Sequence, residues 1–288
     1  MIERFRRGWA LLKASGSVLW NHPKLAVFPV VSVISIFALC FAIVPLLALG
    51  TKTLPHLATA DPIVVKVVVF AILFALYFTF SFVAIFFNAA LTYCALQCFA
   101  GDTPSIRAGL AAAGRRIPQI AAWTFVASTI GLIIRCIQDA LKKVPVVGEL
   151  LSALLGASWV AITFFVLPVV VIDGIGPFAA LKASTTALKK TWGQATVSVG
   201  GLGLMFSLSM LPVIGWSWLA AKFGGAAALS PGMALGSGLL VIGYVAVAWI
   251  IFVTLTTIVR TGAYVYAITG DAPGNMDDGL FQSLFKTK

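Results

Sequence analysis

The chain has 288 residues, of which 60% are hydrophobic and only 10% are charged, and it carries a formal net charge of +11. A soluble domain usually has about 25% charged residues because water must wet its surface. This composition therefore excludes an ordinary soluble protein and favours a chain surrounded by lipid. Two histidines and nine acidic residues leave few candidates for acid–base catalysis, and the common hydrolase and phosphate-loop motifs are absent from the sequence. We therefore expect no enzymatic activity.

Uncharged stretches follow one another along the chain, over residues 25–51, 67–101, 117–134, 150–172, 191–221 and 223–259. A helix that crosses about 30 Å of hydrocarbon needs about 20 apolar residues, and all but 117–134, which is at the lower limit, exceed that length. We predict an all-α integral membrane protein, a single membrane domain over residues 1–288, with about six transmembrane or partly re-entrant helices. Their expected ranges are 25–50, 64–99, 118–141, 149–172, 194–221 and 236–268.

Three amphipathic segments with basic residues each lead into a membrane helix, and they begin near Ile2, Ile106 and Phe178. In the second segment the apolar stripe consists of Ile106, Leu110, Ala113 and Ile117. An apolar stripe beside Lys and Arg is typical of a helix at the membrane surface, where anionic lipid headgroups attract the cations. The interfacial anchors that we expect at this level are Trp9, Trp20 and Trp192. The alternative is that these segments are cytoplasmic connectors packed on the bundle.

The order of these elements recurs, together with some short sequence words. Leu-Lys-Ala-Ser occurs at 12–15 and again at 181–184, and Gly-Asp-Thr-Pro at 101–104 resembles Gly-Asp-Ala-Pro at 270–273. We predict three helical-hairpin units, each with an interfacial helix, an outward helix and a return helix. These units cover residues 1–103, 104–176 and 177–275, and a C-terminal tail over 276–288 follows them.

Lysine and arginine are divided unequally between the two sides of the predicted bundle. Fourteen lie on the side of the termini and six on the other side. The positive-inside rule then predicts a multi-pass membrane protein with both termini in the cytoplasm. Arg135, Lys142 and Lys143 depart from this bias, so segments three and four either cross fully or form a re-entrant hairpin. We interpret the net charge as topology and contact with anionic lipid, and we expect no nucleic-acid partner.

Polar side chains inside a membrane are costly, so they are candidates for function. Arg135, near the end of segment three, either lines an anion path or extends to the headgroups. Arg260, near the end of the last helix, either contacts a solute or phosphate or forms an ion pair with Asp271 or Asp173. The complete set of candidate solute or phosphate contacts is Arg260, Arg135, Lys24, Asn88, Gln97 and Asp173. The two amides are alternatively interhelical hydrogen-bonding groups, and the aspartate is alternatively a helix cap.

Glycines concentrate in the last two predicted helices. Small residues let helix backbones approach closely, so we expect helix packing at Gly200, Gly201, Gly203, Gly232 and Gly236. Glycine and proline can alternatively mark an interruption that lines a transport site, and Pro212 follows the first cluster. The four cysteines and two histidines do not have the spacing of a metal site, and we expect no metal and no cofactor.

The beginning of the chain resembles uncharacterised multi-pass membrane families of bacteria and archaea. The resemblance rests on Arg6-Arg7-Gly8-Trp9 and on Phe28-Pro29-Val30-Val31. Those families begin with a Trp-containing amphipathic helix, and a Phe-Pro-hydrophobic helix start follows. This resemblance covers the whole chain and implies a multi-pass protein of a bacterial or archaeal cytoplasmic membrane, but it implies no activity.

A second resemblance is to the CysZ-type sulfate permeases, over roughly residues 5–220. It rests on Val144-Pro145-Val146-Val147-Gly148, on Asp173, Pro177 and Phe178, and on Met210-Leu211-Pro212. It implies anion permeation and paired helices that penetrate the membrane only part way. The sequence departs from that family because only Lys24 stands where a basic pair is expected, and because a further C-terminal helix is present. Both departures put sulfate specificity in doubt.

Three functions remain open at this point. The first is a permease or channel-like protein for a small solute, with an anion as one candidate. The second is a non-transporting membrane scaffold that organises lipid or a partner complex, and the third and weakest is an intramembrane enzyme. A homo-oligomer and a membrane protein partner are both compatible with the sequence, which names neither a substrate nor a partner.

The composition generates one direct prediction. We expect the purified chain to stay in solution only with detergent or lipid, because hydrocarbon is the solvent for most of its surface. Size-exclusion chromatography with and without detergent measures this, and a monodisperse protein in plain buffer would contradict the membrane assignment.

Overall fold

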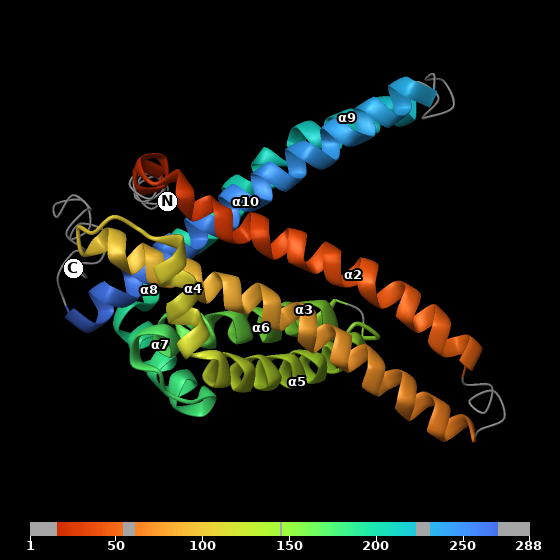
Figure 1. The fold of residues 1–288 in the computed structure, drawn as a ribbon, viewed down its shortest axis with the longest axis horizontal. Helices are drawn as coiled ribbons and strands as arrows, with labels where there is room; N and C mark the ends of the chain where they lie inside the picture. Colours follow the sequence, from red (N-terminus) through yellow and green to blue (C-terminus); the bar gives the residue numbers. More distant parts are fainter. Residues whose placement is uncertain (1–15, 54–60, 145, 223–230, 270–288) are drawn as a thin grey trace. The chain divides into compact units, whose positions relative to one another are not determined.

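Every element that the structure describes is a helix (Figure 1). The computed structural model describes residues 16–53, 61–144, 146–222 and 231–269, and within them the side chains of 46–53, 190–199, 221, 231–234 and 269 are not described. The helices are η1 (Pro23–Ala26), α2 (Val27–Thr53), α3 (Pro62–Phe99), α4 (Ile106–Arg115), α5 (Ile117–Leu141), α6 (Val147–Ile162), α7 (Val166–Asp173), α8 (Pro177–Ser209), α9 (Leu211–Lys222) and α10 (Pro231–Thr269).

Among the described residues, six stretches of helix are long and apolar enough to cross a membrane. They are Pro23–Pro45, Pro62–Phe99, Ile117–Leu141, Val147–Asp173, Gly200–Ala220 and Leu235–Ile268. This finding confirms the prediction of an all-α membrane protein with six spans. Their ends also lie close to the predicted ends, with 117–141 found where 118–141 was expected. Spans four and five differ from the prediction in one respect, because each consists of two helices.

The chain divides into two compact units. The first comprises residues 1–26, 95–103 and 190–288, and it contains η1, most of α8, α9 and α10. The second comprises residues 27–94 and 104–189, and it contains α2, most of α3, α4 to α7 and the first turns of α8. The threefold repeat stays a prediction, and the tail over 276–288 lies outside the described residues.

In the second unit, α5 and α6 pack as a hairpin (Figure 1). The rings of Trp123 and Trp159 stack with their centroids 6.4 Å apart, and the side-chain amide of Gln138 donates to the Ser152 carbonyl at 2.8 Å. Gly148 lies so close to the end of α5 that a Cβ there would collide with the Leu141 carbonyl. At about 1.5 Å per residue the 16 residues of α6 cover about 24 Å, less than the hydrocarbon thickness. Whether this hairpin crosses fully or is re-entrant stays a prediction.

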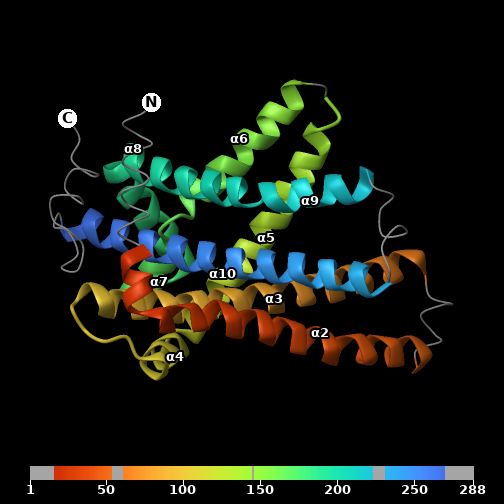
Figure 2. The same cartoon turned by 90° about the horizontal axis from the view of Figure 1, so that it is seen from above.

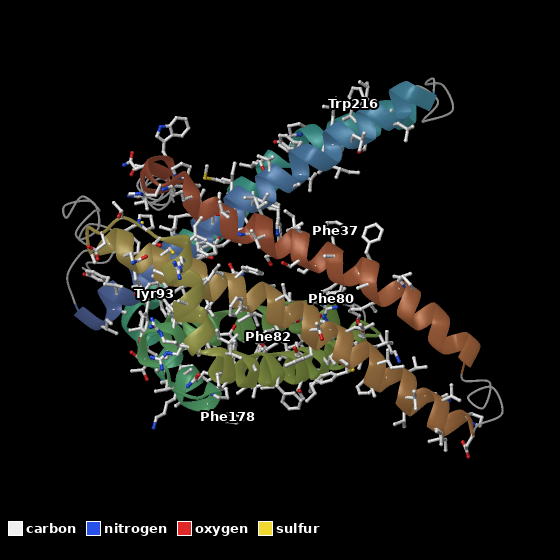
Figure 3. All side chains as sticks on the ribbon, in the orientation of Figure 1. Phe37, Phe80, Phe82, Tyr93, Phe178 and Trp216 are labelled. Carbon is white, nitrogen blue, oxygen red and sulfur yellow. The ribbon has the colours of Figure 1, made fainter. Side chains whose placement is uncertain are left out.

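The outer parts of α2 and α3 bury little apolar surface. No residue in the most apolar stretch of α3 is buried within the chain, and Phe37 on α2 is 63% exposed and projects away from its helix (Figure 3). A water-soluble protein does not leave apolar helices open on all sides, whereas a membrane protein presents them to lipid. We therefore assign these surfaces to the lipid-facing part of the protein.

Helix α4 packs on α3 through its smallest residues. Its buried face consists of Gly109, Ala112 and Ala113. A Cβ on Gly109 would lie 2.6 Å from the Cys94 sulfur and 2.9 Å from the Ala90 carbonyl, both on α3. Leu110, part of the predicted apolar stripe, is instead exposed. The segment is amphipathic, as predicted. Its buried face, however, is the one whose small residues let the α4 backbone approach α3 closely.

In the first unit, α9 runs alongside α10 (Figure 2), and α10 also contacts η1. Aromatic side chains join α8 to α10, because the Phe206 ring packs 4.7 Å from Phe252 and 5.8 Å from Trp249 between centroids. With its 39 residues, α10 is about 58 Å long. It is therefore much longer than a bilayer's hydrocarbon core of about 30 Å.

We predict opposite outcomes for two glycines of α4. Replacing Gly109→Ala forces a methyl group into the contact with α3, and overpacking of this kind costs about 1–3 kcal/mol. Replacing Gly114→Ala meets no atom within 4 Å and adds helix propensity, about 1 kcal/mol at most. Thermal unfolding in detergent should therefore show a lower Tm for the first variant and an unchanged or higher Tm for the second. Equal Tm values would contradict the packing.

Candidate functional site

Span four is interrupted between α6 and α7, where two backbone amides donate to carbonyls three residues back. The Phe164 amide donates to Ala161 at 3.2 Å and the Val166 amide donates to Thr163 at 3.2 Å, each three residues back. A regular helix would use carbonyls four residues back. Pro168 explains the position, because its ring clashes with the carbonyl four residues before it. The Phe165 amide and the Ile162 carbonyl are consequently released from the helix.

A single side-chain hydroxyl forms hydrogen bonds with both of these backbone groups. Ser184 on α8 accepts a hydrogen bond from the Phe165 amide at 3.0 Å and donates one to the Ile162 carbonyl at 2.7 Å. Ser184 is completely buried, and an unsatisfied backbone group in such a place would be costly. This side chain therefore allows span four to be interrupted inside the protein.

Span five has a matching interruption between α8 and α9. Pro212 has no amide hydrogen, and the Val213 amide donates to the Met210 carbonyl at 3.0 Å, three residues back. In a regular helix this amide would donate to Ser209. The Ser209 carbonyl instead accepts a hydrogen bond from the Tyr244 hydroxyl of α10 at 2.6 Å. As in span four, a hydroxyl from a different helix satisfies the group that a proline-associated interruption releases.

An open groove lies beside this second interruption, between α8 and α10. Its volume is about 320 Å³. The wall contains Leu202, Met205, Phe206, Ser209, Tyr244, Val247, Ala248, Ile251, Phe252 and Leu255. The lining is apolar and aromatic, and the hydrogen-bonded Ser209–Tyr244 pair supplies its polar contact. Small-molecule sites usually have this composition and a volume of about 300–1,000 Å³.

Polar residues follow the groove along α10. Thr254, Thr256, Thr257 and Thr261 are buried, and all but Thr256 donate to the carbonyl four residues back, at 2.7–2.9 Å. The Thr256 hydroxyl is buried without a hydrogen-bond partner in the described part of the chain. Arg260 lies in the same stretch, half-buried, with its Nε atom buried. Four threonines and one arginine thus lie within residues 254–261 of an otherwise apolar helix.

The length of α10 bears on the depth of Arg260. This residue lies 29 positions after Pro231, or about 43 Å along the helix, and a bilayer's hydrocarbon core is about 30 Å thick. The helix can therefore cross the hydrocarbon before it reaches Arg260. This geometry favours a position at the headgroup level over one at the centre of the membrane.

The other candidate contacts are dispersed along the chain. Arg135 is exposed on α5 near the ion pair between Lys142 and Asp139, whose atoms are 3.3 Å apart. Lys24 is exposed in η1, and Asp173 is exposed at the end of α7. Asn88 and Gln97 are half-buried on α3. Roles for these residues in binding stay predictions.

The anchors and glycines are only partly described. Trp20 is 88% exposed, as an anchor outside the bundle would be, whereas Trp9 and the side chain of Trp192 lie outside the described residues. A Cβ on Gly200, Gly201, Gly203 or Gly236 would meet no atom within 4 Å in the described structure. The surroundings of Gly232 are not described. In the described residues, close backbone approaches occur at Gly109 and Gly148, and helix packing at the five predicted glycines stays a prediction.

Ser184 and Tyr244 were not among the functional residues predicted from the sequence. Signals for both exist, because Pro168 and Pro212 lie inside predicted spans and Ser184 ends the repeated Leu-Lys-Ala-Ser word. Neither signal indicates which distant hydroxyl satisfies the backbone. The partner of Ser184 in this word, Ser15, lies outside the described residues.

The chain belongs to a family of unknown function, DUF6159, which matches residues 67–274. No curated protein and no solved structure matches the chain. Membership confirms the resemblance to an uncharacterised family. The second resemblance, to the CysZ-type sulfate permeases, is not shown by these comparisons.

The interruption of span four yields a second stability prediction. Replacing Ser184→Ala leaves the Phe165 amide and the Ile162 carbonyl buried without their partner, at a cost of about 1–3 kcal/mol per group. Ser158→Ala serves as the control, because this serine donates only to the Leu154 carbonyl of its own helix at 2.8 Å. We expect thermal unfolding in detergent to show a clearly lower Tm for the first variant. A Tm no lower than that of the control would contradict the bridging role.

Proposed function

We propose that this family member is a non-enzymatic permease or channel-like protein for a small anionic solute. One observation carries the proposal: span five is interrupted beside a groove, and Tyr244 holds the released Ser209 carbonyl at the groove wall. Irregular backbone inside a membrane is tolerated where it is buried in protein or lines a cavity. Transporters use such interrupted helices to build their solute sites.

The second interrupted span supports the same proposal. Paired interruptions in hydrophobic segments are a sequence-level indication of a transport site, and here Pro168 and Pro212 accompany the two interruptions. At both interruptions, hydroxyl groups from other helices form hydrogen bonds with the backbone, with donor–acceptor distances of 2.6–3.0 Å. Two uninterrupted helices would satisfy the backbone more simply if the spans were only membrane anchors.

The charge distribution supports an anion as the solute. The chain has 20 Lys and Arg residues and 9 Asp and Glu residues, and a cationic surface raises the local concentration of anions. Arg260 lies five residues beyond Leu255, which lines the groove, or about 8 Å along the helix. A solute leaving the groove along α10 would therefore meet a guanidinium group. In this proposal the protein lies in a bacterial or archaeal cytoplasmic membrane with both termini in the cytoplasm.

A non-transporting scaffold is the second candidate. It is favoured by the regular row of exposed apolar residues on α2, at Val31, Ile34, Phe37, Phe41 and Val44. Residues three and four apart share a helix face, so this row could pack on another membrane protein. A scaffold predicts no solute flux and a stable complex after purification, which separates the two candidates.

A flux assay tests the permease proposal. In proteoliposomes we expect uptake of sulfate, phosphate or chloride above that of protein-free liposomes, with little uptake of glucose. Tyr244→Phe should lower the flux about two- to tenfold, because a hydrogen bond of about 0.5–1.5 kcal/mol that shapes the groove is lost. Tyr77→Phe makes the same chemical change on α3, at a residue that does not line the groove, and should leave the flux unchanged.

Two results would contradict the proposal. If the flux of every solute equals that of protein-free liposomes, the permease proposal is ruled out and the scaffold is favoured. If the Tyr244→Phe and Tyr77→Phe variants show equal flux, the groove is ruled out as the path of the solute.

A further inference from the structure

Helix α4 has an outward face on which cations and an apolar side chain alternate. Its small residues Gly109, Ala112 and Ala113 are buried, so the opposite side of the helix faces outward. Arg107, Leu110 and Arg115 are exposed there. Leu110 has 36% of its surface exposed, which adds an apolar group to the cationic face.

The first turns of α8 show the same combination. Ala180, Ser184, Ala187 and Leu188 are buried, whereas Phe178, Lys182 and Lys189 are exposed. Phe178 has 72% of its surface exposed and lies at the outer edge of α8 (Figure 3). The spacings of four and seven residues place these three side chains on one helix face.

A direct contact joins the two helices within the second unit. Gly174, in the turn before α8, has a φ of 66°, and a Cβ there would collide with the Arg116 guanidinium. Arg116 is the residue between α4 and α5. We call the six exposed residues on the two helices the basic surface: Arg107, Leu110, Arg115, Phe178, Lys182 and Lys189. Neither helix contains an Asp or Glu residue.

The helices that continue from the basic surface enter the apolar part of the chain directly. Helix α5 begins at Ile117 and has no charged residue before Arg135, and α8 has none after Lys190. The surface thus lies where cationic and apolar groups can reach headgroups and acyl chains together.

We propose that the basic surface binds anionic phospholipid, with its four cations on the headgroup phosphates and Phe178 and Leu110 among the upper acyl carbons. Charge complementarity supports this partner, because each cation near an anionic membrane surface contributes about fivefold in affinity. The mixture of cations with a strongly exposed aromatic ring favours lipid over a soluble anion, which would have no use for the ring. The basic surface shares no residue with the lining of the groove between α8 and α10.

The test uses the full chain in mixed micelles of detergent with equal amounts of dioleoyl-phosphatidylglycerol and dioleoyl-phosphatidylcholine. Native mass spectrometry then counts each lipid retained by the protein. We expect a preference for phosphatidylglycerol that the triple change Arg107→Gln, Arg115→Gln and Lys182→Gln lowers at least about tenfold. The matched control removes the same charge from Arg135, Lys142 and Lys143, which are also exposed in the second unit, and should keep the preference.

Two further arms keep the proposal testable if the triple variant folds poorly. In the unmodified protein, about 1 M salt shortens the Debye length to about 3 Å and should abolish the preference. Phe178→Ser keeps all cations and should lower the total lipid retained. The proposal is overturned by an equal loss of preference in the control, by no preference in the unmodified protein, or by displacement of the lipid with inorganic phosphate at unchanged ionic strength.

Discussion

The fold depends on one constraint, which is that hydrocarbon offers the backbone no hydrogen-bonding partner. Long helices satisfy this requirement by themselves, which is why every described element is a helix. The two interruptions do not, and each requires a hydroxyl from a distant part of the chain. Ser184 holds an amide and a carbonyl in span four, and Tyr244 holds a carbonyl in span five. Irregular backbone that the chain maintains at this cost is the strongest indication of function in the molecule.

Individual helices have one part that is exposed and another part that is packed inside the protein. On α10 the residues up to Ile251 are largely exposed and apolar, whereas Thr254 to Tyr264 contains most of its buried residues. On α3 the exposed part likewise precedes the buried one, which begins at Ala89. Small side chains dominate these buried parts, because lipid supplies no hydrophobic drive for helix association and close contact must replace it. The exposed parts are free to face lipid or another membrane protein.

The groove and the basic surface have different chemistry and suit different ligands. The groove is apolar and carries one satisfied polar pair, and Arg260 lies five residues beyond its lining residue Leu255 in the sequence. The basic surface combines cations with exposed apolar side chains, and we propose that it lies at the membrane boundary. A permease needs both an internal path and a stable position in the bilayer, so the two proposals are compatible without depending on each other.

Composition and length alone determined the six spans, because an uncharged run of about 20 residues has few alternatives to a membrane helix. Sequence also located the amphipathic segment that became α4. It could not locate the buried face of α4, since that face is chosen by how closely Gly109 approaches Ala90 and Cys94. Nor could it select Ser184 and Tyr244 from the hydroxyl-bearing residues of the chain. Those choices arise from contacts between segments far apart in sequence, and a span that is apolar on every side has no periodicity to reveal them.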